Sequence, residues 1–597
     1  MIDLIICEKP SASKMVAAAF GDSTYKKAGN RSYFISNYKG NKIFIVSAAG
    51  HLFDLKKREY PIVGPLENYT FDFDWEGSWK LRETDSYKRD YFTCIKNVYT
   101  ENKFDRVIIG CDFDIEGLLI GFMILTQLKV KKDKMFWMKM NSLAKYDVEK
   151  AYNNLEKPDI AWVNAGIARH EIDALFGWNM TKIFSNAAKK YRSRYRTISL
   201  GRVQSPTLHL VTEREEAIQK FVPEKYYSIR MTIEVDGIPY FAYHTNGDMK
   251  DKITAEEIIN RCKNITECEV SDIKEVIEKK TPYHCFNIST CEQESWKYLH
   301  YTPKFVDEHL QQLYSFGLIS YPRTGSTSLH GVPYQMVLDS LSNEQEYFSF
   351  TNKIRTEGFI PLSGGKSDLA HTAIYPTGKD SSFINNDYDK NILDIIKRRF
   401  ISTFFPDLIM CRKFVTLFCS ADFFILGSSN IVDQGWTEVY HFYKPEVVPI
   451  PDLKCGQKII VKNIELLEHT TKPPSRYSFA SLVREMEKIS LGTKATRSDI
   501  CKKLEDRGYI FTQNGSGITP TSLGKKLIEI TLKYSPKISD IEMTRELEKN
   551  MDGISKGTIS RSEVIEQART TLKEILLTTT ANMDSVGKEL AEAMIYR

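Results

Sequence analysis

The chain has 597 residues, of which 82 are Lys or Arg and 77 are Asp or Glu, and its formal net charge is +5. At roughly 100–200 residues per domain, this length predicts three to five folding units and excludes a single small binding module. The apolar fraction of 42% and the charged fraction of 27% are typical of a folded protein and exclude a largely disordered chain. The small positive excess does not identify an anionic partner, because the charges would also have to cluster on one surface.

The N-terminal sequence MIDLIICEKP lacks the basic start and the roughly 7–15-residue apolar stretch of a signal peptide. The sequence also has no run of about 18 uncharged apolar residues, which predicts that it does not span a membrane. We therefore expect a cytoplasmic protein. Its 11 cysteines include no Cys-x-x-Cys pair, so we expect free thiols and no zinc.

Short apolar runs within residues 1–155 are typical of strands in a parallel sheet that is covered on both faces. They occupy residues 4–7, 43–46 and 107–110. Together they predict an α/β domain. Ligands of such sheets bind beyond the carboxyl ends of the strands, so the residues that directly follow these runs are candidates for a site.

Three acidic residues, Asp112, Asp114 and Glu116, follow the third apolar run. In extended backbone, alternate residues point the same way, which predicts that the three carboxylates converge. Convergent carboxylates repel one another unless a hard cation such as Mg²⁺ neutralises them. A solvent-exposed acidic turn is the alternative. The position after a buried strand, with Glu8 and Lys9 after the first strand, favours metal-dependent phosphoryl transfer.

The sequence GGKS at residues 364–367 is similar to the end of a P-loop. The earlier glycine that a P-loop requires would be at position 360, which is Ile360, and no strand leads into the segment. We therefore expect no use of ATP.

The remainder of the chain predicts helical and all-β parts. Residues 156–215 have a helical pattern that includes a basic segment at 189–196, with five cations and two tyrosines. This segment is either a solvated loop or a place where tyrosines stack on the bases of a single strand. Alternating β-branched and aromatic residues predict one all-β unit from residues 225–280 and 405–465, split by a mostly helical insertion at about 285–400.

The C-terminal part predicts a helix-turn-helix with a wing-like strand. Ser478 is a candidate N-cap of the first helix, and Thr496 with Asp499 resembles a capping box of the second. Gly508 is a candidate stop before a strand at residues 509–511.

Several motifs resemble those of a known family. Residues 4–10 and 112–117 resemble the two halves of a Toprim domain, which topoisomerases share with some primases and nucleases. The segment GLISYPRT at 317–324 is similar to the nucleophile segment of type IA DNA topoisomerases, in which arginine follows the tyrosine by two residues. The segments SLGRVQSPT at 199–207, AHTAIYPT at 370–377 and GTKATR at 492–497 resemble further motifs of this family in the same order. These motifs are similar to those of the archaeal and topoisomerase III-like branch of the family.

The resemblance implies a multidomain α/β and α+β fold with a toroidal core. Residues 1–155 would form the Toprim metal-binding domain. Residues 156–215 and 470–597 would form a helical, winged-helix-like DNA-binding domain. Residues 216–284 and 401–469 would form a split β-rich gate domain, and residues 285–400 a helical domain that carries the nucleophile.

The resemblance also implies roles for individual residues. Tyr321 would attack a phosphodiester to give a 5′-phosphotyrosine, and Arg323 would favour the phenolate and hold the phosphate. Lys9 would add a positive charge, and Glu8 would give a proton to the leaving 3′ oxygen or help the metal. His371 would contact the scissile phosphate, although a core histidine is the alternative. The expected Mg²⁺ ligands are Glu8, Asp112, Asp114 and Glu116. The expected DNA contacts are Arg169, Asp173, Arg202, Gln204, Thr496 and Arg497, where Arg169 and Asp173 could instead pair across one helical turn.

These expectations describe an ATP-independent, Mg²⁺-dependent isomerase that acts on single-stranded segments of negatively supercoiled DNA. It would relax or decatenate DNA as a nucleoid-associated monomer, with a helicase as a candidate partner. Two other classes stay open. A Toprim nuclease or primase would use the same carboxylates without a tyrosine adduct, and a non-catalytic DNA-binding protein would use neither.

Overall fold

The N-terminal part of the computed structural model is a six-stranded sheet in the order β2-β3-β4-β1-β7-β8. The structure describes residues 1–58, 66–191, 196–367, 371–513 and 517–594. The strands of this sheet are β1 (Ile2–Cys7), β2 (Ser23–Ala28), β3 (Arg31–Tyr38), β4 (Asn41–Ser47), β7 (Arg106–Gly110) and β8 (Met135–Trp137). The strands from β4 to β8 are parallel, as the apolar runs predict, whereas β2 and β3 add an antiparallel edge.

Helices cover both faces of this sheet, which explains why its central strands are apolar at every position. Ile5 packs in the core beneath α1 (Pro10–Ala19) and α5 (Lys145–Asn153). Leu4 and Ile6 point to the opposite face, which α3 (Lys88–Glu101) and α4 (Ile115–Gln127) cover. A separate hairpin of β5 (Phe53–Lys57) and β6 (Phe73–Gly77) follows the sheet.

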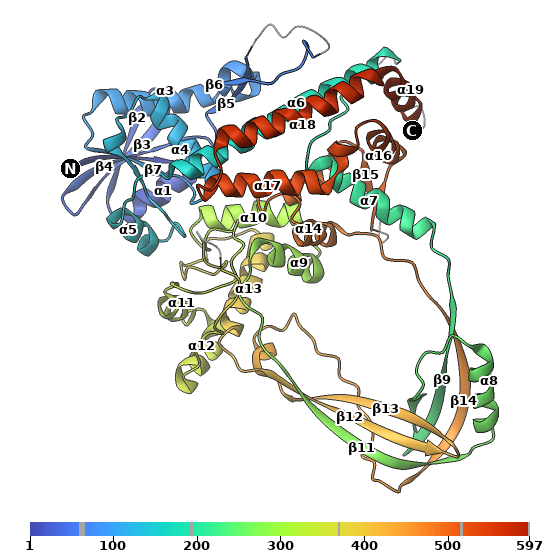
Figure 1. Cartoon of the computed structure of the whole chain (residues 1–597). Coiled ribbons are helices and arrows are strands. Elements are labelled where there is room, and N and C mark those ends of the chain that lie inside the picture. Colours follow the sequence, from blue (N-terminus) through green and yellow to red (C-terminus); the bar gives the residue numbers. More distant parts are fainter. Residues whose placement is uncertain (59–65, 192–195, 368–370, 514–516, 595–597) are drawn as a thin grey trace.

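The helical part combines two distant stretches of the chain. The long helix α6 (Ile160–Lys190) packs against α17 (Ile541–Ser555), α18 (Arg561–Ala581) and α19 (Met583–Ala593) (Figure 1). The other elements of this part are α7 (Gln204–Gln219), α14 (Phe479–Lys488), α15 (Arg497–Asp506), β15 (Ile510–Gln513), β16 (Gly517–Pro520) and α16 (Ser522–Tyr534).

The predicted helix-turn-helix is present, with one cap misassigned. Ser478 caps α14 in a reciprocal arrangement with Ser481, and Gly508 stops the chain after α15 with a φ of 69°. The hairpin of β15 and β16 forms the wing. The predicted capping box at Thr496 is wrong, because the Thr496 hydroxyl accepts a hydrogen bond from the Thr493 backbone N–H instead of capping α15.

The all-β part is a closed barrel in the order β10-β13-β12-β11-β14-β9, and its two halves come from both sides of an insertion, as predicted. Its strands are β9 (Lys225–Val235), β10 (Ile238–His244), β11 (Glu267–Lys280), β12 (Leu408–Cys419), β13 (Asp422–Asp433) and β14 (Lys458–Thr470), and α8 (Lys252–Cys262) packs beside them. The insertion contains α9 (Ile288–Leu299), α10 (Pro303–Ser315), α11 (Tyr334–Leu341), α12 (Gln345–Glu357) and α13 (Asp387–Ser402).

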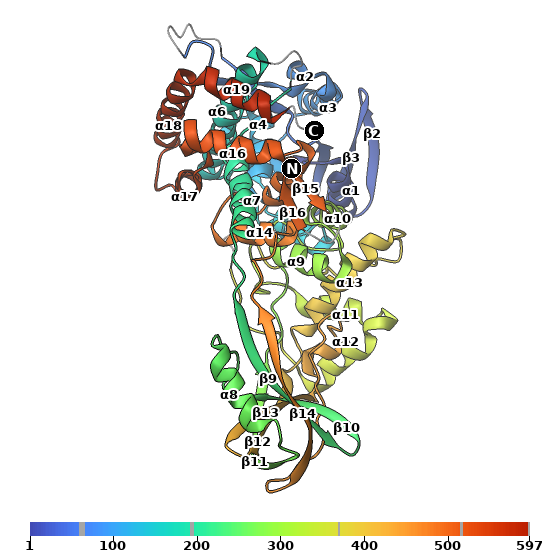
Figure 2. The same cartoon turned by 90° about the vertical axis from the view of Figure 1, so that its right-hand side faces the viewer.

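The parts follow one another around a ring. The barrel lies far from the N-terminal sheet and is joined to the helical part through β9 and β14, and to the insertion through β11 and β12 (Figures 1 and 2). The insertion in turn contacts the N-terminal domain and the helices at 479–506. None of the helices within the described ranges is long and apolar enough to cross a membrane.

Candidate active site and DNA-binding cavity

Tyr321 lies in a short extended segment after α10, which backbone hydrogen bonds connect to two other parts of the chain. On one side, the Ser320 backbone N–H donates to the Tyr375 carbonyl at 3.0 Å. On the other side, the Tyr321 backbone N–H donates to the Asn141 carbonyl at 2.8 Å, which ties the insertion to the N-terminal domain. The site is therefore formed where these two domains meet.

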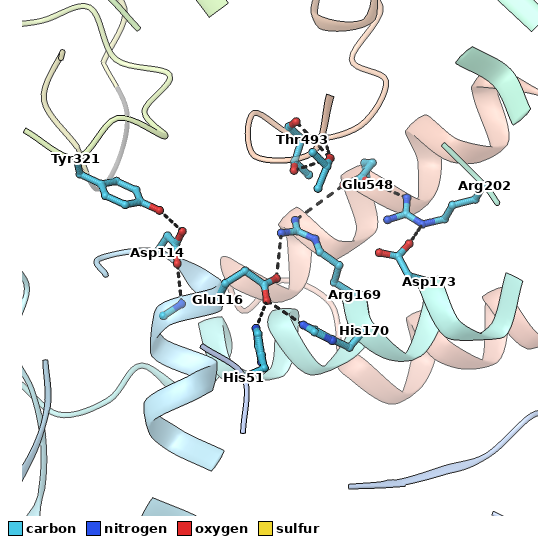
Figure 3. A network of polar contacts seen from close by, with 12 residues as sticks. His51, Asp114, Glu116, Arg169, His170, Asp173, Arg202, Tyr321, Thr493 and Glu548 are labelled. Atoms are coloured by element: carbon cyan, nitrogen blue, oxygen red, sulfur yellow. Dashed lines mark hydrogen bonds and ion pairs between the residues drawn. The ribbon is translucent and has the colours of Figure 1, made fainter. Parts of the chain in front are cut away.

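The hydroxyl of Tyr321 donates a hydrogen bond to the carboxylate of Asp114, 207 positions away in the sequence (Figure 3). Tyr321 is only 2% exposed, and its ring lies 4.9 Å from the ring of His371. Burial raises the pKa of Tyr321 well above its usual value, and the charges of Asp114 and Asp112 add to this shift. In this closed arrangement the phenol is held protonated.

Arg323 does not overcome this shift. Its charge lowers the pKa of Tyr321, but less than burial and the two aspartates raise it. Its guanidinium contacts Asp307 of α10 at 3.3 and 3.4 Å. The expected direction of the Arg323 effect is thus present, but burial and the two aspartates outweigh it, and Asp307 shares the charge of the guanidinium.

An acidic cluster formed by Glu8, Asp112 and Asp114 lies beside Tyr321, at the carboxyl ends of β1 and β7. Lys9 Nζ lies 3.1 Å from Glu8 Oε1 and 3.7 Å from Asp112 Oδ2. Burial and the charge of Glu8 still raise the pKa of Asp112 well above its ordinary value, with Lys9 opposing. The pKa of Asp114 is raised by the same two causes. Buried carboxylates that repel one another and offer only oxygen atoms fit a hard divalent cation such as Mg²⁺.

Glu116 does not join this cluster, which corrects the prediction of three convergent carboxylates. Asp114 caps α4 by accepting a hydrogen bond from the Gly117 backbone N–H at 2.7 Å, so the chain is helical from residue 115 and no longer alternates. Glu116 Oε2 lies instead 3.0 Å from His51 Nε2 and 2.8 Å from His170 Nε2 (Figure 3). Burial opposes the charge of Glu116, but the two histidines outweigh it and hold the pKa of this carboxyl well below its usual range.

A polar cavity of about 590 Å³ opens between α6, α7, α15 and α17. Its lining includes five of the six residues expected to contact DNA, namely Arg169, Asp173, Arg202, Gln204 and Thr496. Arg497 lines a neighbouring cavity of about 940 Å³, and Arg169 and Glu548 belong to both linings. The predicted contacts therefore lie together, although they come from segments more than 300 residues apart.

Ion pairs already neutralise much of the charge in this cavity. Arg202, whose side chain is 3% exposed, donates to Asp173 and to Glu548 at 2.6 Å each. Arg169 NH1 lies 3.9 Å from Glu116 Oε1, and Arg169 NH2 lies 4.0 Å from Glu548 Oε2 (Figure 3). Arg169 and Asp173 thus turn to other partners and do not pair across the helical turn.

The remaining predicted contacts are held by nearby backbone or polar groups. Arg507 donates to the side chain of Gln204. Arg497 donates to the carbonyls of Leu491 and Gly492 at 3.2 and 3.0 Å. In the basic segment 189–196, residues 192–195 lie outside the described residues, and Lys190 pairs with Asp584 of α19.

Comparisons with known proteins agree with this arrangement. The sequence pattern of the DNA topoisomerase family matches residues 157–566, and that of the Toprim domain matches residues 3–143. DNA topoisomerase 1 of Methanothermobacter thermautotrophicus is 34% identical over 99% of this chain and 81% of its own length. The protein of the same name from Pyrococcus horikoshii is 34% identical over 99% of this chain and 86% of its own length. The chain belongs to the type IA DNA topoisomerase family.

The fold of this topoisomerase is shared with a bacterial relative. The structure of full-length topoisomerase I from Thermotoga maritima superposes with a TM-score of 0.75 at 22% identity, covering 96% of this chain and 90% of that chain. The match supports the multidomain fold with its toroidal core. The family and Toprim matches, with the DNA topoisomerase 1 relatives, show that the chain is an isomerase with a Toprim domain.

Sequence reasoning missed several residues that shape the topoisomerase site. They are His170, Asp307, Tyr314 and Glu548, whereas His51 follows the second apolar run and so was among the candidate positions. Glu548 is a partner of Arg202 at a separation of 346 positions, and no local pattern indicates it. Tyr314, whose ring lies edge-on to that of Tyr321 at 5.3 Å, looks in the sequence like a core residue of an amphipathic helix. His170 directly follows Arg169, so the proximity of that candidate was the one available signal.

Proposed function

We propose that this topoisomerase cleaves single-stranded DNA transiently through Tyr321, in a reaction that needs Mg²⁺ and no ATP, and passes a strand through the break before religation. The observation that carries the proposal is the hydrogen bond between the Tyr321 hydroxyl and Asp114 of the acidic cluster. It joins the hydroxyl of Tyr321, the predicted nucleophile, to a carboxylate of the Toprim domain, which supports this proposal.

The chemistry exchanges one phosphodiester for another. The Tyr321 oxygen attacks phosphorus, the bond from phosphorus to the 3′ oxygen breaks, and the strand is left with a 5′-phosphotyrosine and a 3′-hydroxyl. Asp114 already accepts the hydrogen bond of the phenol, so this carboxylate is placed to receive its proton. Because the new ester stores the energy of the old one, religation needs no ATP.

Cationic side chains would stabilise the phosphate during transfer. Arg323 can present two parallel N–H donors to phosphate oxygens. In the structure these donors contact the carboxylate of Asp307, which a phosphate would replace. Lys9 lies on the opposite, Toprim side and contacts Glu8, which can supply a proton to the leaving 3′ oxygen. His371, next to the Tyr321 ring, would contact the same phosphate.

The acidic cluster would hold Mg²⁺ through Glu8, Asp112 and Asp114. When bound there, Mg²⁺ neutralises the carboxylates and draws a phosphate group into the site. Glu116 is left out of this set, because His51 and His170 hold its carboxylate.

The two polar cavities would guide the single strand toward Tyr321. They share Arg169, which also lies beside Glu116 in the first turn of α4. Their cations would exchange carboxylate partners for DNA phosphates, and such contacts bind any sequence because phosphates carry no base information.

Strand passage requires that the insertion move away from the Toprim domain. The contacts to break include the hydrogen bonds of Tyr321 with Asp114 and Asn141 and that of Tyr375 with Asp147, together with apolar packing between the two domains. The barrel connects the insertion to the rest of the chain through paired strands, which suits a hinge. Relaxation or decatenation, a monomeric state, a helicase partner and a cytoplasmic, nucleoid-associated location belong to the same proposal.

Trapping the covalent intermediate tests this function. The protein is incubated with an oligonucleotide and Mg²⁺ and then denatured. A label at the 3′ end should travel with the protein, whereas a label at the 5′ end should not. Tyr321→Phe should abolish the adduct and keep DNA binding. Tyr388→Phe is a control that removes the hydroxyl of an exposed tyrosine elsewhere in the insertion and should retain the adduct.

Two results would contradict the proposal. An adduct that persists in Tyr321→Phe would reject the nucleophile. Cleavage by the intact protein without any adduct would instead favour a Toprim nuclease.

A further inference from the structure

A second cluster of metal-binding side chains lies apart from the acidic cluster. His51 lies in the loop between β4 and β5, Glu116 in the first turn of α4, and His170 in α6. Among the described residues, these three have ligand atoms that all lie within 4.8 Å of one another. Their side chains are 25–32% exposed, so solvent can reach them.

Two of the three ligand separations in this cluster are close to those of a tetrahedral metal site. Metal–ligand bonds of about 2.0–2.2 Å at tetrahedral angles place ligand atoms ~3.3 Å apart. Glu116 Oε2 lies 3.0 Å from His51 Nε2 and 2.8 Å from His170 Nε2. Shifts of a few tenths of an ångström would bring these two distances to the tetrahedral value once both Nε2 atoms are free of protons, and the ligand atoms of all three residues already lie within 4.8 Å of one another.

The surroundings leave the metal-facing atoms accessible. Arg169 approaches the other oxygen of Glu116, Oε1, at 3.9 Å, so it can orient the carboxylate without covering Oε2. The rings of His51 and His170 lie side by side with centroids 4.8 Å apart, and Trp75 packs against His170 at 5.6 Å. These contacts restrict both imidazoles to positions that face Glu116 (Figure 3).

We propose that His51, Glu116 and His170 bind a first-row transition-metal dication of the Zn²⁺ type, with one open position for water. Two imidazole nitrogens and one carboxylate are typical of such ions, whereas the oxygen-only set of the acidic cluster suits Mg²⁺. The absence of Cys-x-x-Cys pairs does not argue against this site, because it uses no cysteine. The ion would link the Toprim domain to α6 and keep Glu116 away from the acidic cluster.

Metal binding by the 597-residue chain tests the proposal independently of catalysis. The chain is stripped with chelator, dialysed and titrated with Zn²⁺ against a chromogenic competitor. We expect one ion per chain, bound on the order of a hundredfold more weakly in His51→Ala and His170→Ala. His330→Ala, which removes an exposed histidine elsewhere, should bind like the parent. Co²⁺ in place of Zn²⁺ should give the intense visible absorption of a four-coordinate site.

Further variants keep the test decisive. His170→Gln retains a hydrogen-bond donor for Glu116 and approximates the volume of the ring, so it separates lost ligation from lost folding, which a thermal melt monitors. Asp112→Asn should keep Zn²⁺ affinity while weakening Mg²⁺ binding. Equal Zn²⁺ affinity in the parent and both His170 variants would overturn the site, as would a thiolate-to-cobalt absorption band. Neither result would alter the adduct expected at Tyr321.

Discussion

Two groups of carboxylates lie near the start of α4, and they differ in how their charge is balanced. In the first group, Lys9 contacts Glu8 and Asp112 but not Asp114, and burial and repulsion between carboxylates raise the pKa values of both aspartates. In the second group, histidines and arginines contact Glu116, Asp173 and Glu548. The pKa values of Glu116 and Glu548 are lowered, because these cations outweigh burial.

In the first group, the protein leaves much of the negative charge of the carboxylates unbalanced. In the second group, histidine and arginine side chains balance it. The first group becomes stable when a divalent ion enters, so it couples metal binding to the reaction. In the second group, cationic side chains of the protein already balance the carboxylates. DNA phosphates would replace carboxylates there, and the ion proposed above would replace the protons between Glu116 and its two histidines. Replacing a carboxylate by an amide should therefore have different effects in the two groups.

The largest effect is expected from removing the first group. Asp112→Asn combined with Asp114→Asn should slow single-turnover cleavage in Mg²⁺ more than a hundredfold, or more than about 2.7 kcal/mol of barrier, and more than either change alone. Both the cation and the proton acceptor for Tyr321 would be lost. Quench-flow cleavage of an oligonucleotide measures the rate.

Asp173→Asn is the matched control, because it removes one carboxylate from the balanced group. It should cost less than tenfold in the same assay. A comparable loss of rate in both variants, or full activity of the double variant in chelator, would contradict a specific role of the acidic cluster in cleavage.

The second effect concerns stability and its dependence on pH, measured without metal. Glu548→Gln should lower the free energy of unfolding by about 2 kcal/mol at neutral pH, because it removes a charged partner of the buried Arg202. Asp112→Asn should raise stability there, because it removes a buried charge that is repelled by Glu8.

The two groups should also respond to acid with opposite signs. The raised pKa of Asp112 means that its ionisation costs stability as pH rises above its ordinary value of 3.8. The lowered pKa of Glu548 means that its contribution is present above its ordinary value of 4.5 and is lost as pH falls through the lowered one. Denaturant unfolding across pH 3–7, chosen to span these windows, measures both slopes. If the free energy of unfolding changed equally with pH in Asp112→Asn and Glu548→Gln, the two groups would not differ in charge balance.

Local patterns predicted the elements better than the partners of the site. The apolar runs indicated the parallel strands because both faces of the sheet are buried, and Ser478 was recognised because a cap depends on neighbouring residues. The direction of Glu116 was predicted wrongly, since Asp114 begins a helix and changes the period from two to 3.6. The pairing of Arg202 with Glu548 depends on contact between α17 and the segment that precedes α7, which no local pattern records.

The smallest effect is expected at Arg323. Its charge acts on Tyr321 beside the acidic cluster, but its guanidinium is also paired with a carboxylate, that of Asp307. Arg323→Lys keeps the charge but loses the planar pair of donors, so cleavage should slow about tenfold, or ~1.4 kcal/mol, while DNA affinity changes little. Asp307→Asn is the companion variant. It weakens the existing pair, lets the Arg323 charge act more fully on Tyr321, and should speed cleavage or leave it unchanged. Single-turnover rates of both variants, with binding by fluorescence anisotropy, measure the difference. A rate within about twofold of the parent for Arg323→Lys would show that Arg323 acts as a generic cation, and a large loss in Asp307→Asn would show that the pair itself holds the active geometry.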